Sequence, residues 1–122
     1  MFDHVSFRVA NLAKSHAFYA TSLAPLGIVM IVDTPQSVAF GKAGRAQFWL
    51  NANPTLTTRT HLAFAAENRA AVRAFHAAAL SAGGTDNGAP GPRPHYHPNY
   101  YGAFVLDPDG NNVEAVCRNP EV

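Results

Sequence analysis

The sequence predicts an α+β fold in which two βαβββ repeats form a cupped mixed sheet with the helices on the outside. The first observation is an internal repeat, because a shift of 57 positions, from His4 to His61, superimposes residues 4–27 on residues 61–84 without a gap. Nine of these 24 positions are identical, including His, Phe, Asn, Leu and Gly pairs that an Ala-rich composition does not explain. The second and third observations are strand-like alternation at the start of each copy and helical spacing directly after it.

In the first copy, residues 2–9 alternate between polar and apolar side chains, as in a strand with one buried face. Asn11 is a suitable N-cap for a helix over about 12–23, which Pro25 and Gly27 end. Three short apolar runs separated by turn residues then predict strands at 28–32, 37–40 and 46–51.

The second copy repeats this plan, with a strand over 60–66 and a helix over about 69–82 that Asn68 caps. The predicted buried stripe of this helix is Val72, Phe75, Ala79 and Leu80. Residues 85–99 are rich in Pro and Gly, so we expect mostly loop with one short strand at most. Strands follow at 100–106 and 112–117. We expect one domain over residues 1–122, with repeat 1 at about 2–51, a linker at about 52–59 and repeat 2 at about 60–118.

Composition narrows the class of protein. Hydrophobic residues make up 48% and charged residues 14% of the chain, which is enough to bury a core. The net charge of +1, without a basic stripe, argues against nucleic acid as a partner, and no apolar run reaches the roughly 20 residues of a membrane span. Residues 1–4 lack the basic start of a signal peptide, and the single Cys117 fits a reducing compartment, so we predict a cytoplasmic protein. Sparse surface charge also favours a homodimer.

Three residues are candidate metal ligands: His4, His61 and Glu114. The two histidines open strands at equivalent positions of the repeat, and Glu114 is the only acidic residue in an apolar strand. An ionised carboxylate in such surroundings needs a cation or hydrogen bonds. Two imidazoles and one carboxylate are the ligands of catalytic Zn²⁺ and of non-haem Fe(II). In the alternative interpretation the histidines are structural and Glu114 pairs with Arg8.

Other polar residues are candidates for substrate contacts. His95 and His97 lie in the Pro-rich segment, where they are either acid-base groups or surface histidines. Tyr100 and Tyr101 begin a strand, so alternation places one in the cup and the other on the helix side. Arg8 lies on the same face of its strand as the first histidine, as an anion anchor or as part of a salt bridge.

The chain resembles the vicinal oxygen chelate superfamily, which includes glyoxalase I, fosfomycin-resistance proteins, extradiol dioxygenases and bleomycin-binding proteins. The resemblance covers nearly the whole chain and rests on the doubled βαβββ plan, on Asp3-His4-Val5, on residues 61–64 (His-Leu-Ala-Phe) and on residues 107–114 (Asp-Pro-Asp-Gly-Asn-Asn-Val-Glu). By this resemblance His4, His61 and Glu114 hold one divalent ion, which is zinc, iron, nickel or manganese, and substrate oxygens chelate that ion.

The resemblance implies a metal-dependent enzyme acting on a small oxygen-bearing substrate, as a glyoxalase-like lyase or isomerase, a transferase or a dioxygenase. One departure is that glyoxalase I-like members have a carboxylate ligand on the last strand of the first repeat, whereas no Asp or Glu occurs here from residue 34 to residue 66. Gln47 in that strand is at most a weak ligand. The expected catalytic residues are His95, His97, Tyr100 and Tyr101, and the expected substrate-binding residues are Arg8, Gln47, Trp49 and Arg93.

Two alternatives remain at this point. Bleomycin-binding relatives use the same cup without a metal to sequester a drug, but they generally lack the His/His/Glu set that this chain keeps. A scaffold with an inherited pair of histidines is the other alternative. In many small family members the repeats pair across subunits, so that His4 comes from one chain and His61 with Glu114 from the other. The sequence also allows pairing within one chain.

Overall fold

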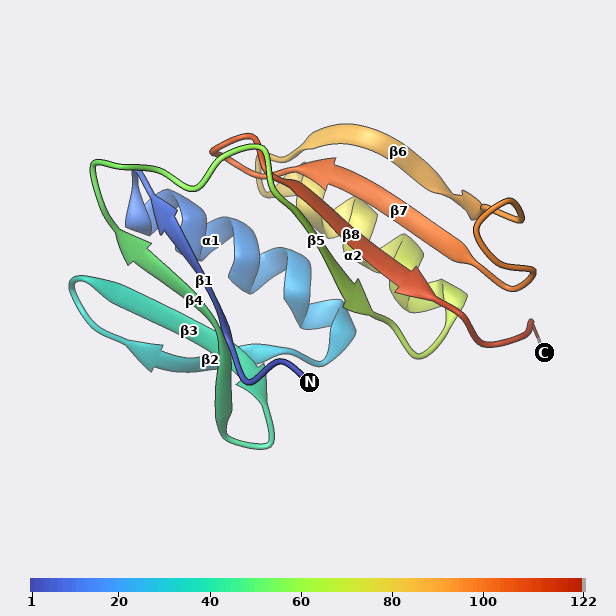
Figure 1. Cartoon of the computed structure of the whole chain (residues 1–122), viewed down its shortest axis with the longest axis horizontal. Helices are drawn as coiled ribbons and strands as arrows, with labels where there is room; N and C mark the ends of the chain where they lie inside the picture. Colours follow the sequence, from blue (N-terminus) through green and yellow to red (C-terminus); the bar gives the residue numbers. More distant parts are fainter. Residues whose placement is uncertain (122) are drawn as a thin grey trace.

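The computed structural model describes residues 1–121 and consists of two four-stranded sheets backed by two helices (Figure 1). The first repeat comprises β1 (Val5–Val9), α1 (Leu12–Leu23), the 3-10 helix η1 (Ala24–Leu26), β2 (Val29–Asp33), β3 (Ser37–Lys42) and β4 (Arg45–Ala52). The second comprises β5 (His61–Ala65), α2 (Arg69–Ser81), β6 (Thr85–Pro92), β7 (Tyr101–Leu106) and β8 (Asn112–Cys117). Among residues 1–121 no helix is long and apolar enough to cross a membrane.

The two sheets have the same topology, which confirms the doubled βαβββ plan. Their strand orders are β1-β4-β3-β2 and β5-β8-β7-β6. In each sheet the first strand pairs in parallel with the last, and the remaining pairs are antiparallel. The helix between the first two strands of a repeat supplies the crossover that parallel pairing requires.

Both helices begin at an asparagine cap, as the repeat predicts. The side chain of Asn11 accepts a hydrogen bond from the backbone N–H of Lys14, and that of Asn68 accepts one from Ala71. Each cap satisfies a donor that the first helical turn leaves unpaired. Val72, Phe75 and Ala79 of α2 are buried as predicted, but Leu80 is 38% exposed, so its predicted burial is wrong. One residue advances a helix by about 100°, which turns Leu80 out of the stripe that ends at Ala79.

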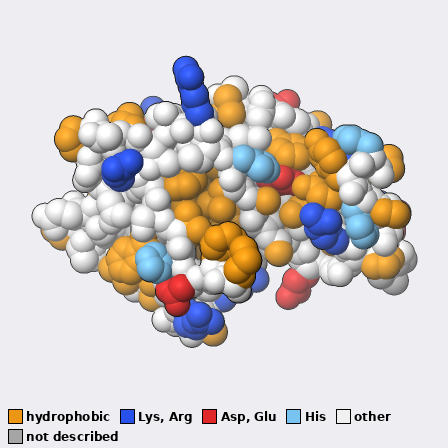
Figure 2. All heavy atoms as spheres, viewed as in Figure 1, with side chains coloured by type: hydrophobic (Ala, Val, Ile, Leu, Met, Phe, Trp, Pro, Cys, Tyr) orange, Lys and Arg blue, Asp and Glu red, His pale blue; other side chains and the backbone are white. Residues whose placement is uncertain are grey.

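The two repeats share one hydrophobic core. The rings of Phe48 in β4 and Phe64 in β5 meet edge to face with centroids 5.5 Å apart. The buried hydroxyl of Tyr19 in α1 donates to Asp107 Oδ2, in the turn before β8, at 2.5 Å. The helices lie behind the sheets in Figure 1, so the opposite faces of both sheets are open in a single chain. Figure 2 shows hydrophobic side chains gathered over the middle of this side, with charged side chains and histidines scattered among and around them.

The strand β6 is longer than the sequence predicts. It extends over eight residues, Thr85–Pro92, in a segment for which we expected mostly loop. It pairs with β7 through two register shifts, and it lies at the edge of its sheet. An edge strand pairs on one side only, so Pro90 and Pro92 lack an N–H without leaving a central ladder incomplete. Strand β1, in contrast, is shorter than the sequence predicts, because it starts at Val5 and not at residue 2.

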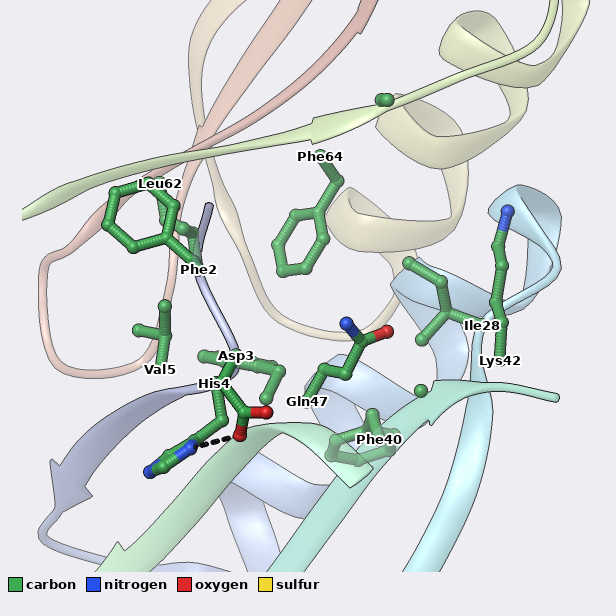
Figure 3. A pocket seen from close by; sticks show the side chains of 13 residues that line it. Phe2, Asp3, His4, Val5, Ile28, Phe40, Lys42, Gln47, Leu62 and Phe64 are labelled. Atoms are coloured by element: carbon green, nitrogen blue, oxygen red, sulfur yellow. Dashed lines mark hydrogen bonds and ion pairs between the residues drawn. The ribbon is translucent and has the colours of Figure 1, made fainter. Parts of the chain in front are cut away.

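A β-bulge in β4 determines the direction of Gln47. Phe40 pairs with Phe48 while its neighbour Gly41 pairs with Ala46, which leaves Gln47 as the extra residue. A Cβ atom on Gly41 would lie 1.6 Å from the carbonyl oxygen of Arg45, so only glycine fits opposite the bulge. The bulge turns Gln47 toward a cavity between the two repeats, as Figure 3 shows.

Candidate metal centre

Glu114 is the centre of the candidate site. It lies in β8, between its cross-strand neighbours Ala63 of β5 and Phe104 of β7, and its side chain is only 2% exposed. Its Oε1 atom is 3.0 Å from Nε2 of His61. Its Oε2 atom accepts a short hydrogen bond from the hydroxyl of Tyr100. Both carboxylate oxygens are therefore engaged, and Oε1 faces an imidazole.

The other ring nitrogen of His61, Nδ1, shows which of the two nitrogens carries the proton. Nδ1 is 3.1 Å from the carbonyl oxygen of Asn112, and since a carbonyl only accepts, Nδ1 carries the proton. In a neutral ring Nε2 then presents a lone pair to the lone pairs of Glu114 Oε1. Two acceptors at 3.0 Å need a proton, on either the imidazole or the carboxyl group, or a metal ion between them. A backbone carbonyl behind a ligating histidine is the usual way to orient it toward a metal.

Tyr100 supports the carboxylate from the other side. Burial, the hydrogen bond to Glu114 and the negative charge of Glu114 together raise the pKa of Tyr100 to about 12. The phenol therefore stays protonated near neutral pH and remains a donor. Tyr101 points the opposite way, to α2, where the guanidinium carbon of Arg69 lies 4.9 Å from the centre of its ring. Of the two tyrosines, Tyr100 is the one that faces the candidate site.

Phe104 belongs to the site although the sequence did not single it out. Its ring stacks on that of His61, with centroids 6.1 Å apart and an interplanar angle of 28°. The guanidinium carbon of Arg93 also lies over this ring, 5.6 Å from its centre. The signal that could have found Phe104 is strand parity, because it lies four residues after Tyr100 and shares its face. The carbonyl of Asn112 has no such signal, since every residue carries one.

His4 is placed elsewhere in the chain. It precedes β1, and its Nδ1 is 2.8 Å from Asp3 Oδ1 at one side of the cavity in Figure 3. The hydrogen bond from His4 lowers the pKa of the Asp3 carboxyl below its ordinary value. Within residues 1–121 no three His, Cys, Asp or Glu side chains lie together in a group able to hold a metal ion. A single chain therefore brings His61 and Glu114 together, but not His4.

The remaining candidates of the first repeat lie on the other sheet. Arg8 is exposed on β1, and it is not a partner of Glu114, so the alternative pair between these residues does not form. Trp49 pairs in register with Ser6 of β1 and is half-buried. Gln47 lines the cavity between the repeats.

The candidates of the Pro-rich segment lie beyond β6, near Tyr100. Nη2 of Arg93 donates to the carbonyl of Ala89 at 2.8 Å, which holds the guanidinium over Phe104. The exposed His95 packs on Tyr96, with ring centroids 4.1 Å apart. Nδ1 of His97 accepts a hydrogen bond of 3.1 Å from the backbone N–H of Asn99, so this half-buried ring is fixed in its loop.

The chain belongs to the Glyoxalase/Bleomycin resistance protein/Dioxygenase superfamily, whose family model matches residues 1–115. This finding confirms the resemblance to the vicinal oxygen chelate superfamily. No curated protein matches the sequence.

Solved structures agree with this assignment. A glyoxalase/bleomycin resistance protein from Albidiferax ferrireducens T118 is 32% identical, with a TM-score of 0.85 and a match over 98% of this chain and 99% of that one. A family enzyme from Burkholderia phytofirmans PsJN is 22% identical, with a TM-score of 0.74 over 96% of this chain and 98% of that one. The lactoylglutathione lyase from Agrobacterium tumefaciens is 22% identical, with a TM-score of 0.68 over 96% and 92%. The last two likenesses concern the fold alone.

Proposed function

We propose that this protein is a divalent-metal-dependent enzyme of the superfamily, acting on a small substrate whose oxygens chelate the metal. Its ligands are His61 and Glu114 of one subunit and His4 of a second copy of the chain. The observation that carries the proposal is the contact of 3.0 Å between Nε2 of His61 and Oε1 of Glu114, because these two atoms need a proton or a metal ion between them. A buried carboxylate with this neighbour is suited to a cation.

The residues present fit a divalent metal. Imidazole nitrogen and carboxylate oxygen are ligands of zinc, iron, nickel and manganese sites alike. His61 is oriented by the carbonyl of Asn112, and Glu114 by the hydroxyl of Tyr100, so both ligands are held before binding. When bound, the metal would supply Lewis-acid stabilisation of negative charge on a substrate oxygen.

The chain's own residues would position the substrate. The flat ring of Phe104 forms a wall beside His61, and the Arg93 guanidinium lies over the same ring. Tyr100 and His97 are the candidates for hydrogen bonds to a bound oxygen or for proton transfer. Because the pKa of Tyr100 is about 12, its role at neutral pH is that of a donor.

A second copy is proposed because His4 is not near the other two ligands in its own chain. Its side chain is 56% exposed, so it is accessible to another molecule. Exposed hydrophobic residues surround the same end of the first repeat, with Phe2 at 76% and Val29 at 56% exposure. Covering these side chains would stabilise a dimer through the hydrophobic effect.

The experiment is a metal analysis of the purified protein together with titration of Zn²⁺, Ni²⁺, Mn²⁺ and Fe²⁺ into the apo form. We expect about one ion per chain in the wild type and its loss in His61→Ala, Glu114→Gln and His4→Ala. His76→Ala is the control that should keep the ion, because His76 lies on α2 and pairs with Asp86 of β6. A wild type that takes up none of the four ions would contradict the proposal and would favour the sequestering protein.

A further inference from the structure

A cavity of about 290 Å³ lies between the two repeats. Aromatic and aliphatic side chains from both repeats form its walls, among them Phe48. Figure 3 shows five others around a common hollow: Phe2, Ile28, Phe40, Leu62 and Phe64. A dry apolar cavity of about 150 Å³ is enough to bind benzene. This cavity is nearly twice as large, so it matches a molecule of one or two rings.

Three aromatic side chains that line the cavity form one cluster. Phe48 meets Phe64 edge to face at 5.5 Å, and Phe40 lies 6.4 Å from Phe48. Aromatic groups favour such offset and edge-to-face contacts, which adds to the gain from burying their surface.

The polar groups of the cavity are unevenly distributed. Asp3 and His4 lie on one side, where they pair with each other at 2.8 Å, and Lys42 lies on the opposite side (Figure 3). Among residues 1–121 Lys42 forms no ion pair, and the side-chain amide of Gln47 forms no hydrogen bond. The bulge at Gln47 aims this free amide into the middle of the hollow.

We infer that this cavity binds a small aromatic carboxylate. Its rings would lie against Phe48 and Phe64, and its carboxylate would lie at the Lys42 side, away from Asp3, within reach of the Gln47 amide. An ammonium and an amide N–H are suitable donors to a carboxylate. His61 and Glu114 do not line the cavity, whereas His4, the third proposed metal ligand, does, so the cavity adjoins the proposed metal site and shares one residue with it.

The test is calorimetric titration of the full chain with 2-naphthoate and with its neutral analogue 2-naphthylmethanol. We expect one binding site for each ligand per chain. Lys42→Met should weaken the binding of 2-naphthoate about fivefold, as expected for the loss of a partly exposed ion pair. The affinity for the alcohol should stay unchanged. Lys14→Met, on α1, is the matched control that should change neither. If Lys42→Met weakens both ligands equally, the assignment of the carboxylate is overturned.

A cavity-filling exchange tests the location. Leu62→Trp should abolish binding of both ligands, whereas Leu80→Trp on the exposed side of α2 should preserve it. Because a tryptophan at position 62 can disturb folding, the wild type also provides a direct readout. Naphthyl protons should show nuclear Overhauser contacts to the methyl groups of Ile28 and Leu62. Absence of these contacts, or no binding to the wild type, overturns the inference.

Discussion

At the scale of single residues, the candidate centre depends on two side chains that contact one carboxylate and on a backbone carbonyl that orients one of them. Tyr100 donates to Oε2 of Glu114, His61 faces Oε1, and the carbonyl of Asn112 fixes the orientation of His61. Each contact comes from a different strand, or from the residue just before a strand, of the second sheet. The sheet therefore prepares a carboxylate and an imidazole before any ligand arrives, which limits the entropy lost on binding.

Tyr100→Phe tests this support. Without its donor, Glu114 Oε2 loses the hydrogen bond that orients it, and loss of such a partner typically costs about tenfold or more in metal affinity. We expect Zn²⁺ to bind at least about tenfold more weakly in Tyr100→Phe, measured by competition with a chelating dye. Tyr101→Phe, which alters the ring that faces α2, should retain wild-type affinity. Equal affinities for both variants would show that Tyr100 has no part in the site.

Sequence reasoning at this scale depended on the composition and the alternation of single strands. It selected Glu114 because one acidic residue stood in an apolar strand, and this carboxylate is buried against His61. It left Tyr100 and Tyr101 as alternatives. Alternation places two neighbouring residues on opposite faces of a strand, but it does not say which face is turned to the helices. It also offered Arg8 as a partner for Glu114, whereas the two carboxylate oxygens contact His61 and Tyr100.

At the scale of elements, the internal repeat predicted most of the architecture. Residues capable of capping a helix recur 57 positions apart, from Asn11 to Asn68, and both cap a helix in the structure. Strand β6 was underestimated because Pro and Gly normally interrupt strands, and the edge position that makes them tolerable is a property of the assembled sheet. The bulge at Gln47 was also missed, because it depends on the register between β3 and β4.

The bulge yields a prediction for Gly41. A methyl group there would lie 1.6 Å from the Arg45 carbonyl oxygen, so Gly41→Ala must push β3 and β4 apart. We expect Gly41→Ala to lower the free energy of unfolding by at least about 3 kcal/mol in urea titrations.

Gly44→Ala is the matched control, because its added Cβ meets nothing within 4 Å and only its φ of +74° is unfavourable. Its expected cost is about 1 kcal/mol. If Gly41→Ala were no more destabilising than Gly44→Ala, the described register of β3 and β4 would be wrong.

At the scale of the whole molecule, one buried hydrogen bond links the two repeats. Tyr19 of α1 donates to Asp107, which also binds Asn111 of the turn before β8. Tyr19→Phe removes the donor and leaves a buried carboxylate oxygen with fewer partners, so we expect a loss of about 1–3 kcal/mol of stability. Tyr96→Phe, at an exposed position, should cost less than about 0.5 kcal/mol in the same denaturation experiment.

The same tyrosine predicts a pH dependence. Burial and the adjacent Asp107 carboxylate raise the pKa of Tyr19 well above its ordinary value of 10.0. The contribution to stability is therefore complete below pH 10 and is lost as the pH rises above 10 toward the folded-state pKa, by up to about 1.4 kcal/mol per pH unit. Tyr19→Phe should show a smaller decline between pH 10 and 11.5 than the wild type. Identical slopes would mean that Tyr19 ionises equally in the folded and unfolded chains.

The position of His4 is also a whole-molecule question that the sequence left open. The resemblance assigned it to the metal together with His61 and Glu114, and it allowed the three to meet within one chain or across two. One chain supplies only His61 and Glu114 to the site within the described residues. Pairing across subunits is therefore the arrangement that we propose, and it makes a prediction that no single-chain site would share.

The most direct test is complementation between two variants that each lack one proposed metal ligand. Differently tagged His4→Ala and His61→Ala chains are mixed, unfolded, refolded together and purified through both tags, and the metal content of the mixed dimers is measured. A site shared between subunits predicts that one of the two sites regains a full ligand set, so the mixed dimer binds one ion while each parent dimer binds none. Mixed dimers that bind no metal, beside wild-type dimers that bind two ions after the same treatment, would contradict the shared centre.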